Sequence, residues 1–127
     1  MTDEATTARY PGRAPIDAYG NGGFRFAGMS HKGSILCLPD AIVAWQPATV
    51  EQLSTECFAA VLGDAKRISF LLLGTGVEHR PPPAWVPKAF ARAGIGLDVM
   101  ATGAAARTWN VLLAEGRPVA AALMVTD

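Results

Sequence analysis

The feature that most constrains the fold is an almost unbroken apolar run at residues 68–73, ISFLLL. Its length is that of a β-strand, and a continuous apolar run is typical of a strand that is covered on both faces. The run leads directly into Gly74-Thr75-Gly76. We therefore predict a central strand, with layers above and below it, that carries a glycine-rich loop at its carboxyl end.

The segments after this strand alternate between helical and extended patterns. A short helix is predicted over residues 85–92, with Pro87 in its first turn, and a strand over 97–100. Thr102 then resembles the N-cap of a helix over 103–115, and a strand follows at 118–125. Strand, helix, strand, helix, strand is the order that favours a parallel sheet with right-handed crossovers.

The first half of the chain predicts antiparallel strands and one helix. Two β-prone pieces within residues 16–26 flank Gly20-Asn21-Gly22-Gly23, which predicts a hairpin. Further strands are predicted at 34–38 and 42–45, around a turn at Pro39-Asp40. Thr49 with Gln52 has the capping-box pattern of a helix that would end at Gly63.

Together these elements predict an α/β domain over residues 15–127. Residues 1–14 are small, polar and punctuated by proline, so we expect a disordered N-terminal leader. A chain of 127 residues is long enough to bury a core of its own.

The amino-acid composition indicates which kinds of partner and which cellular compartment to expect. Eleven basic side chains balance eleven acidic ones, so we expect no nucleic-acid partner. Cys37 and Cys57 lie within apolar runs, which is typical of reduced, buried cysteines. Because no apolar run reaches the roughly 18 residues of a membrane span and no secretory signal is evident, we expect a cytoplasmic protein.

The strongest candidate for a ligand site is the loop after the central strand, because ligands of open α/β sheets bind beyond the carboxyl ends of strands. The hypothesis groups five residues around one crevice that would favour an anion: Gly74, Thr75, Gly76, Thr102 and Arg107. The alternative is structural. The loop would then be a tight turn, Thr102 a helix cap, and Arg107 the partner of Asp98 or Glu115.

Other chemical sites find little support. His31 and His79 occupy polar, turn-like stretches without neighbouring ligands at metal spacing, so no metal and no cofactor is expected. The serines lack the context of a nucleophile elbow, whereas a pairing of Cys37 with His31 in space stays open.

Carboxylates and tryptophans leave two further possibilities. A carboxylate pair drawn from Asp98, Glu115 and Glu78 stays open as well, although such groups are usually solvated or paired with an arginine such as Arg92 or Arg117. Trp85, which follows three prolines, is a candidate anchor for a protein partner.

Several segments together resemble one family. These are residues 16–20 (IDAYG), residues 23–26 (GFRF), Gly74-Thr75-Gly76 and residues 105–117 (AARTWNVLLAEGR). The chain resembles a small single-domain family of unknown biochemical function that includes a mitochondrial assembly factor of respiratory complex I. The resemblance implies a three-layer fold in which helices and a β-hairpin pack on a mixed central sheet. It implies no catalytic activity, and its eukaryotic members act by binding during assembly.

Two functions follow as hypotheses. The first is a non-enzymatic interaction or assembly-factor domain, linked to respiratory complex biogenesis, whose protein partner would be a respiratory-chain component. The alternative is a domain that binds a small molecule or anion at the Gly74-Thr75-Gly76 loop, either as an enzyme or as a binding domain without catalysis. The sequence sets neither the oligomeric state nor the identity of partner or ligand.

Overall fold

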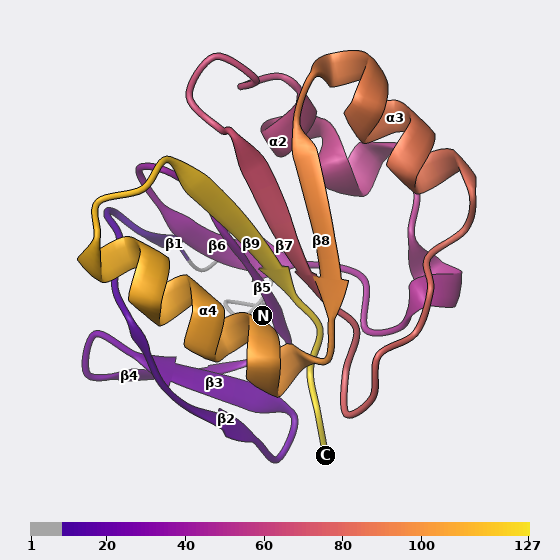
Figure 1. Ribbon diagram of the computed structural model, residues 1–127. Coiled ribbons are helices and arrows are strands. Elements are labelled where there is room, and N and C mark those ends of the chain that lie inside the picture. Colours follow the sequence, from indigo (N-terminus) through magenta and orange to yellow (C-terminus); the bar gives the residue numbers. More distant parts are fainter. Residues whose placement is uncertain (1–8) are drawn as a thin grey trace.

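The middle layer of the molecule is a six-stranded mixed sheet, seen in a computed structural model that describes residues 9–127 (Figure 1). Across the sheet the strands lie in the order β1 (Arg9–Tyr10), β6 (Ile42–Trp45), β5 (Ser34–Cys37), β9 (Val119–Leu123), β7 (Phe70–Gly74) and β8 (Gly96–Met100). The pairs β1–β6, β6–β5 and β5–β9 are antiparallel, whereas β7 is parallel to both β8 and β9. The α/β fold class with a mixed central sheet is confirmed.

Strand β7 comes from the apolar run that the sequence places at the centre of the fold. Leu71 and Leu73 are fully buried on one face of the sheet, and Leu72 is fully buried on the other. Because β7 is paired with β8 along one edge and with β9 along the other, its backbone hydrogen bonds are satisfied on both sides. The prediction of a strand covered on two sides is therefore confirmed.

One face of the sheet is covered by α3 (Trp85–Ala93) together with α2 (Ala59–Leu62) and the short 3-10 helices η1 (Val50–Gln52) and η2 (Glu56–Phe58) (Figure 1). Phe58 is fully buried here and makes an edge contact with Phe90, with 5.1 Å between the ring centroids. Helix α3 ends at Gly94, whose φ of 74° is a left-handed cap that glycine adopts without strain.

The opposite face carries α4 (Thr102–Ala114) and a second sheet of three antiparallel strands, β2 (Ile16–Gly20), β3 (Gly23–Phe26) and β4 (Met29–Lys32) (Figure 1). The predicted hairpin is the β2–β3 pair. It turns through Asn21 and Gly22, which both have positive φ, as a tight two-residue hairpin turn requires. Strand β4 was not predicted.

The continuous helix predicted between Thr49 and Gly63 is wrong. Thr49 makes no side-chain cap, and Leu53 has an extended backbone conformation that ends η1. A new turn begins at Ser54, whose Oγ accepts a hydrogen bond from the backbone N–H of Cys57 at 3.3 Å. A serine side chain that bonds to nearby backbone groups competes with the hydrogen bonds of a continuous helix. The segment therefore forms three short turns in place of one helix.

The boundary predicted at residue 14 stays a prediction, but contacts of the fold extend to its N-terminal side. Tyr10 pairs with Ile42 in the sheet, Ala14 is buried, and the Ala14 carbonyl accepts a hydrogen bond from Trp109 Nε1 at 3.0 Å. Residues 1–8 of the predicted leader lie outside the described residues.

None of the helices within residues 9–127 combines the length and the apolar character needed to cross a bilayer.

Candidate functional site

Four of the five predicted ligand-site residues meet where β7 and β8 end. The Thr75 N–H donates to the Met100 carbonyl at 2.9 Å, and the Gly76 N–H donates to Thr102 Oγ1 at 2.9 Å. Thr102 Oγ1 in turn donates to the Met124 carbonyl at 2.7 Å. The loop after β7, the first residue of α4 and the end of β9 are therefore held together by hydrogen bonds.

The hydroxyls of both threonines of the candidate site, Thr75 and Thr102, form hydrogen bonds within the protein. Thr75 Oγ1 donates to the Glu78 carbonyl at 2.8 Å and accepts the Arg80 N–H at 2.9 Å. The Thr102 hydroxyl bridges Gly76 and Met124 and is fully buried. These hydroxyls fix the loop, and a ligand would have to displace the internal bonds in order to use them.

Thr102 is not the N-cap of the last helix, contrary to the prediction. The cap position belongs to Ala101, and Thr102 is already the first helical residue of α4. Its side chain turns inward because β7 passes directly beneath it. A Cβ at Gly74 would lie 2.9 Å from the Thr102 Cα, so glycine is needed in the strand for this close approach.

Arg107 lies beside this loop on the solvent side. A groove of about 380 Å³ is lined by Gly76 and Arg107 together with Tyr19, Gly103 and Asp127. The predicted ion pairs of Arg107 with Asp98 or Glu115 are absent from the described part of the chain, where Glu115 contacts Arg117 at 3.8 Å instead. The five predicted residues thus share one region, and ligand binding by them stays a prediction.

Trp85, the predicted partner anchor, is half-buried as the first residue of α3. Its ring makes an edge contact with Phe58 at a centroid distance of 6.2 Å. Part of the indole therefore belongs to the core, and its role in binding a partner stays a prediction.

The two cysteines have the properties of core residues. Cys37 is fully buried and Cys57 half-buried, and both are free thiols. Burial raises the pKa of both thiols, which disfavours the nucleophilic thiolate. Cys37 lies in the core cluster beneath α4, where a nucleophile would not reach a substrate. Within residues 9–127 no group of three or more histidine, cysteine or acidic side chains could hold a metal ion.

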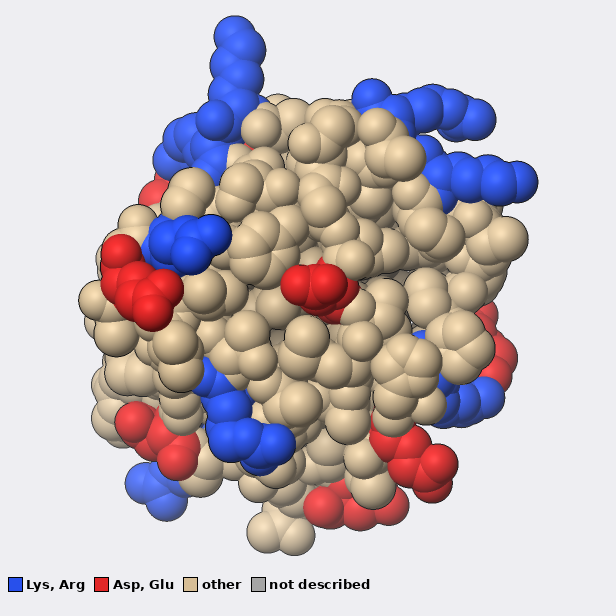
Figure 2. All heavy atoms as spheres, in the orientation of Figure 1, with Lys and Arg blue, Asp and Glu red and all other residues tan. Residues whose placement is uncertain are grey.

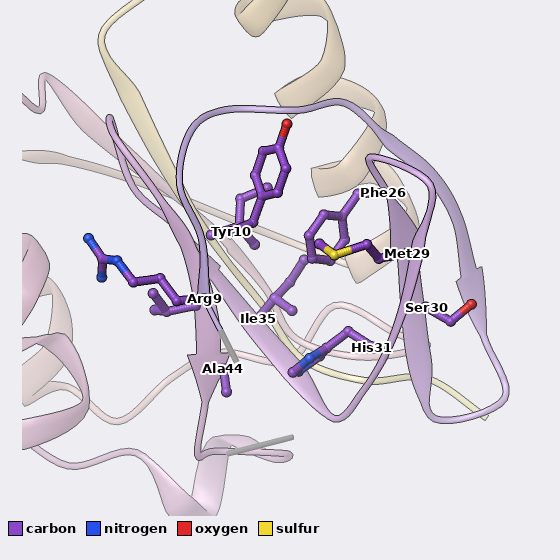
Figure 3. A pocket seen from close by; sticks show the side chains of 10 residues that line it. Arg9, Tyr10, Phe26, Met29, Ser30, His31, Ile35 and Ala44 are labelled. Carbon is purple, nitrogen blue, oxygen red and sulfur yellow. The ribbon is translucent and has the colours of Figure 1, made fainter. Parts of the chain in front are cut away.

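His31 occupies a place that the sequence did not indicate. The predicted polar turn is wrong, because His31 lies in β4 and is only 9% exposed. It borders a small pocket of about 80 Å³ between the two sheets, which is lined mainly by apolar side chains such as Tyr10, Met29 and Ile35 (Figure 3). His31 Nε2 is buried and has no hydrogen-bond partner among residues 9–127.

The glycines on either side of β4 are the sequence signal that could have identified this strand. Ala27 and Gly28 both have positive φ and form a second two-residue turn, which leads into β4, and Gly33 follows that strand with a φ of 95°. A glycine at each end of a four-residue segment is typical of a short strand that is bounded by turns. The alternating pattern that would identify a half-buried strand has only four residues here, MSHK, in which His31 alone is buried.

The environment of His31 predicts a pH-dependent stability. Burial lowers the pKa of His31 below its ordinary value of 6.5, an effect that a hydrogen bond with the Ser34 backbone opposes. Above pH 6.5 the neutral imidazole is favoured in both states. As the pH falls through 6.5 toward the folded pKa, the unfolded chain binds the proton first, so stability is lost at up to about 1.4 kcal/mol per pH unit.

Urea unfolding at a series of pH values measures this loss. His31→Gln should flatten the acidic limb of the profile. His79→Gln provides the matched control, because it makes the same substitution at an exposed histidine. An unchanged acidic limb in His31→Gln would refute the assignment.

Solved structures with the same fold cover almost the whole chain. A Bartonella henselae protein whose structure is described as that of an outer membrane protein is 49% identical, with a TM-score of 0.88 over 93% of this chain and 99% of its own. A Rhodopseudomonas palustris protein is 42% identical, with a TM-score of 0.81 over 98% of this chain and 93% of its own. The fold is therefore shared with bacterial relatives.

Sequence relatives extend from bacteria to mammals. An uncharacterized protein of Rhodobacter capsulatus is 36% identical over 91% of this chain and 87% of its own length. The human NADH dehydrogenase [ubiquinone] 1 alpha subcomplex assembly factor 3 is 31% identical over 95% of this chain and 63% of its own. The chain thus spans less than two thirds of that assembly factor. A family model described as "protein of unknown function (DUF498/DUF598)" matches residues 16–124, and the chain belongs to this family.

Proposed function

We propose that this chain is a non-enzymatic interaction domain that takes part in the assembly of a respiratory NADH dehydrogenase by binding one of its components. The observation that carries the proposal is the similarity to assembly factor 3, which is 31% identical in human and 30% identical in mouse over more than nine tenths of this chain. Because the assembly factors are longer, the proposal concerns the domain that they have in common with this chain.

The chemistry of the folded chain supports a binding role. The hydroxyls of Thr75 and Thr102 are committed to backbone partners, and burial suppresses the thiolate form of Cys37. Charged side chains lie mainly around the margin of the face seen in Figure 2, which leaves a broad uncharged area on it. Interfaces between proteins are depleted of charge at their centre, so a surface of this kind suits a protein partner.

Affinity capture from native extract tests the proposal. The tag belongs at the N-terminus, because Asp127 lines the groove at the other end of the chain. We expect subunits of the NADH dehydrogenase to be enriched over a capture with an unrelated bait of equal size. Equal recovery with the two baits would argue against the proposal. The predicted cytoplasmic location is tested by fractionation of the same cells.

The alternative function is binding of an anion or small molecule, with or without catalysis, in the groove beside the Gly74-Thr75-Gly76 loop. The observation that favours it is that Gly76 and the exposed Arg107 line one groove. An NMR titration with phosphate, nucleotides and carboxylates distinguishes the two functions. Shifts confined to Gly76, Gly103 and Arg107 would support the alternative, and Arg107→Gln should abolish them. A flat response across the panel would remove it.

A further inference from the structure

Strand β8 forms one border of the six-stranded sheet, and among residues 9–127 its pairing partner is β7 alone. The Gly96 N–H donates to the Ser69 carbonyl, and the Met100 carbonyl accepts the Thr75 N–H, both at 2.9 Å. In a parallel strand the N–H and C=O of one residue point to the same side, and successive residues alternate. Gly96, Asp98 and Met100 therefore bond toward β7, and the backbone groups of the residues between them face away from it.

The residues that face away are Leu97 and Val99. No hydrogen bond engages their N–H or C=O groups in the part of the chain that the structure describes. Their side chains are half-buried on the α3 side of the sheet, and that of Met100 is half-buried on the α4 side. The free edge thus offers two donors and two acceptors at strand spacing, with apolar surface on both sides, which is the arrangement that accepts an added strand.

The surroundings of this edge are almost free of charge. Figure 2 shows a broad area over β8 that is mostly uncharged and carries acidic atoms near its middle. Asp98 is the acidic residue of β8, its side chain is exposed, and it forms no ion pair within residues 9–127. A strand added to β8 would therefore meet one unpaired carboxylate at its centre.

The position of Asp98 discriminates between occupants. If β8 paired with β8 of a second copy about a two-fold axis centred on the strand, the two Asp98 carboxylates would lie opposite each other, and like charges in that position destabilise a pair. A basic side chain opposite Asp98 would stabilise it. The carboxylate thus opposes association of copies and favours a partner strand of the opposite charge.

We propose that the free edge of β8 binds an extended segment of a partner protein that places a lysine or arginine beside Asp98. The proposal rests on the proposed function, since it names the surface through which the chain holds its partner. The main-chain bonds of Leu97 and Val99 supply affinity, and Asp98 supplies selectivity for charge.

NMR titration of the full chain with two peptides tests the proposal directly. The probes are the capped heptapeptide TVTKTVT and the same peptide with glutamate in place of lysine. The lysine peptide should give saturable shifts at the amides of Leu97, Asp98 and Val99. The glutamate peptide should bind about fivefold or more weakly, because a like-charged pair replaces an opposite-charged one.

Two pairs of variants separate the backbone and charge contributions. Val99→Pro removes an N–H that faces away from β7, so the β7 ladder keeps all its bonds while the added strand loses one. Val99→Ala keeps that N–H and provides the control for lost side-chain packing. Asp98→Asn should bring the two peptides to within about twofold of each other, and Asp98→Lys should reverse their order.

The proposal is overturned if the lysine peptide leaves β8 unperturbed at millimolar concentration, if both peptides bind the wild-type chain equally, or if Val99→Pro and Val99→Ala behave alike. These results do not depend on whether the chain assists the NADH dehydrogenase. A chain that captures subunits of that complex but ignores both peptides would retain the proposed function and lose the β8 edge as its surface. A chain that binds the lysine peptide selectively but captures no subunit would show the reverse.

Discussion

Replacing Trp109 with alanine is expected to lower the free energy of unfolding by about 3–5 kcal/mol. Trp109 is fully buried in α4, within the apolar cluster between the two sheets. Its Nε1–H donates to the Ala14 carbonyl at 3.0 Å, and the Arg13 guanidinium lies 5.3 Å from the ring centre. The substitution would therefore create a cavity and release the segment that leads into β2.

Equilibrium unfolding in urea, followed by circular dichroism, measures this loss. Val111→Ala provides the control within the same helix, because Val111 is 57% exposed and its truncation should cost less than about 0.5 kcal/mol. Similar losses for Trp109→Ala and Val111→Ala would contradict the packing of α4 described above.

Replacing Thr102 with valine is expected to lower the free energy of unfolding by about 2–4 kcal/mol, because two buried backbone groups lose their partner. The hydroxyl accepts the Gly76 N–H and donates to the Met124 carbonyl, and valine has nearly the same shape but can do neither. The two lost hydrogen bonds would weaken the contact between the β7 loop, α4 and the end of β9.

Thr102→Ser keeps the hydroxyl and should retain most of this stability. Thermal unfolding of both variants gives the comparison. Hydrogen exchange at the Gly76 amide adds a local measurement, since exchange should accelerate in the valine variant only. If valine and serine were equally tolerated, the Thr102 hydroxyl would not hold the loop.

The second half of the chain could be predicted well because its pattern is unambiguous. The apolar run before Gly74 has strand length, and the elements that follow it are separated by helix-ending glycines such as Gly94 and Gly116, which both have positive φ. Each element predicted from residue 68 onward matches an observed one to within two residues at every boundary. The parallel pairing of β7 with β8 and β9 follows from that order.

The first half could be predicted only in part, because local hydrogen bonds compete there with the periodic pattern. Ser54 interrupts the helical spacing of the apolar residues around it, an effect that apolar periodicity does not register. Strand β4 is too short for its single buried residue, His31, to reveal an alternation.

The candidate site could be located but not resolved from the sequence. That Gly76 and Arg107 line one groove follows from the meeting of strand ends at a single edge of the sheet. The inward turn of the Thr102 hydroxyl depends instead on its distance from Gly74, which only the folded chain sets. The free edge of β8 could not be predicted from the sequence either. The pairing register with β7 decides that the backbone groups of Leu97 and Val99 face away from β7.

The most direct test of the proposed function is the amount of assembled NADH dehydrogenase in cells that lack this chain. Native gel electrophoresis with an in-gel activity stain measures it, in the deletion strain and after return of either the wild-type chain or the Trp109→Ala variant. We predict a loss of the assembled complex that the wild-type chain restores and the destabilised variant restores poorly. A deletion strain with the full amount of assembled, active complex would contradict the proposed function.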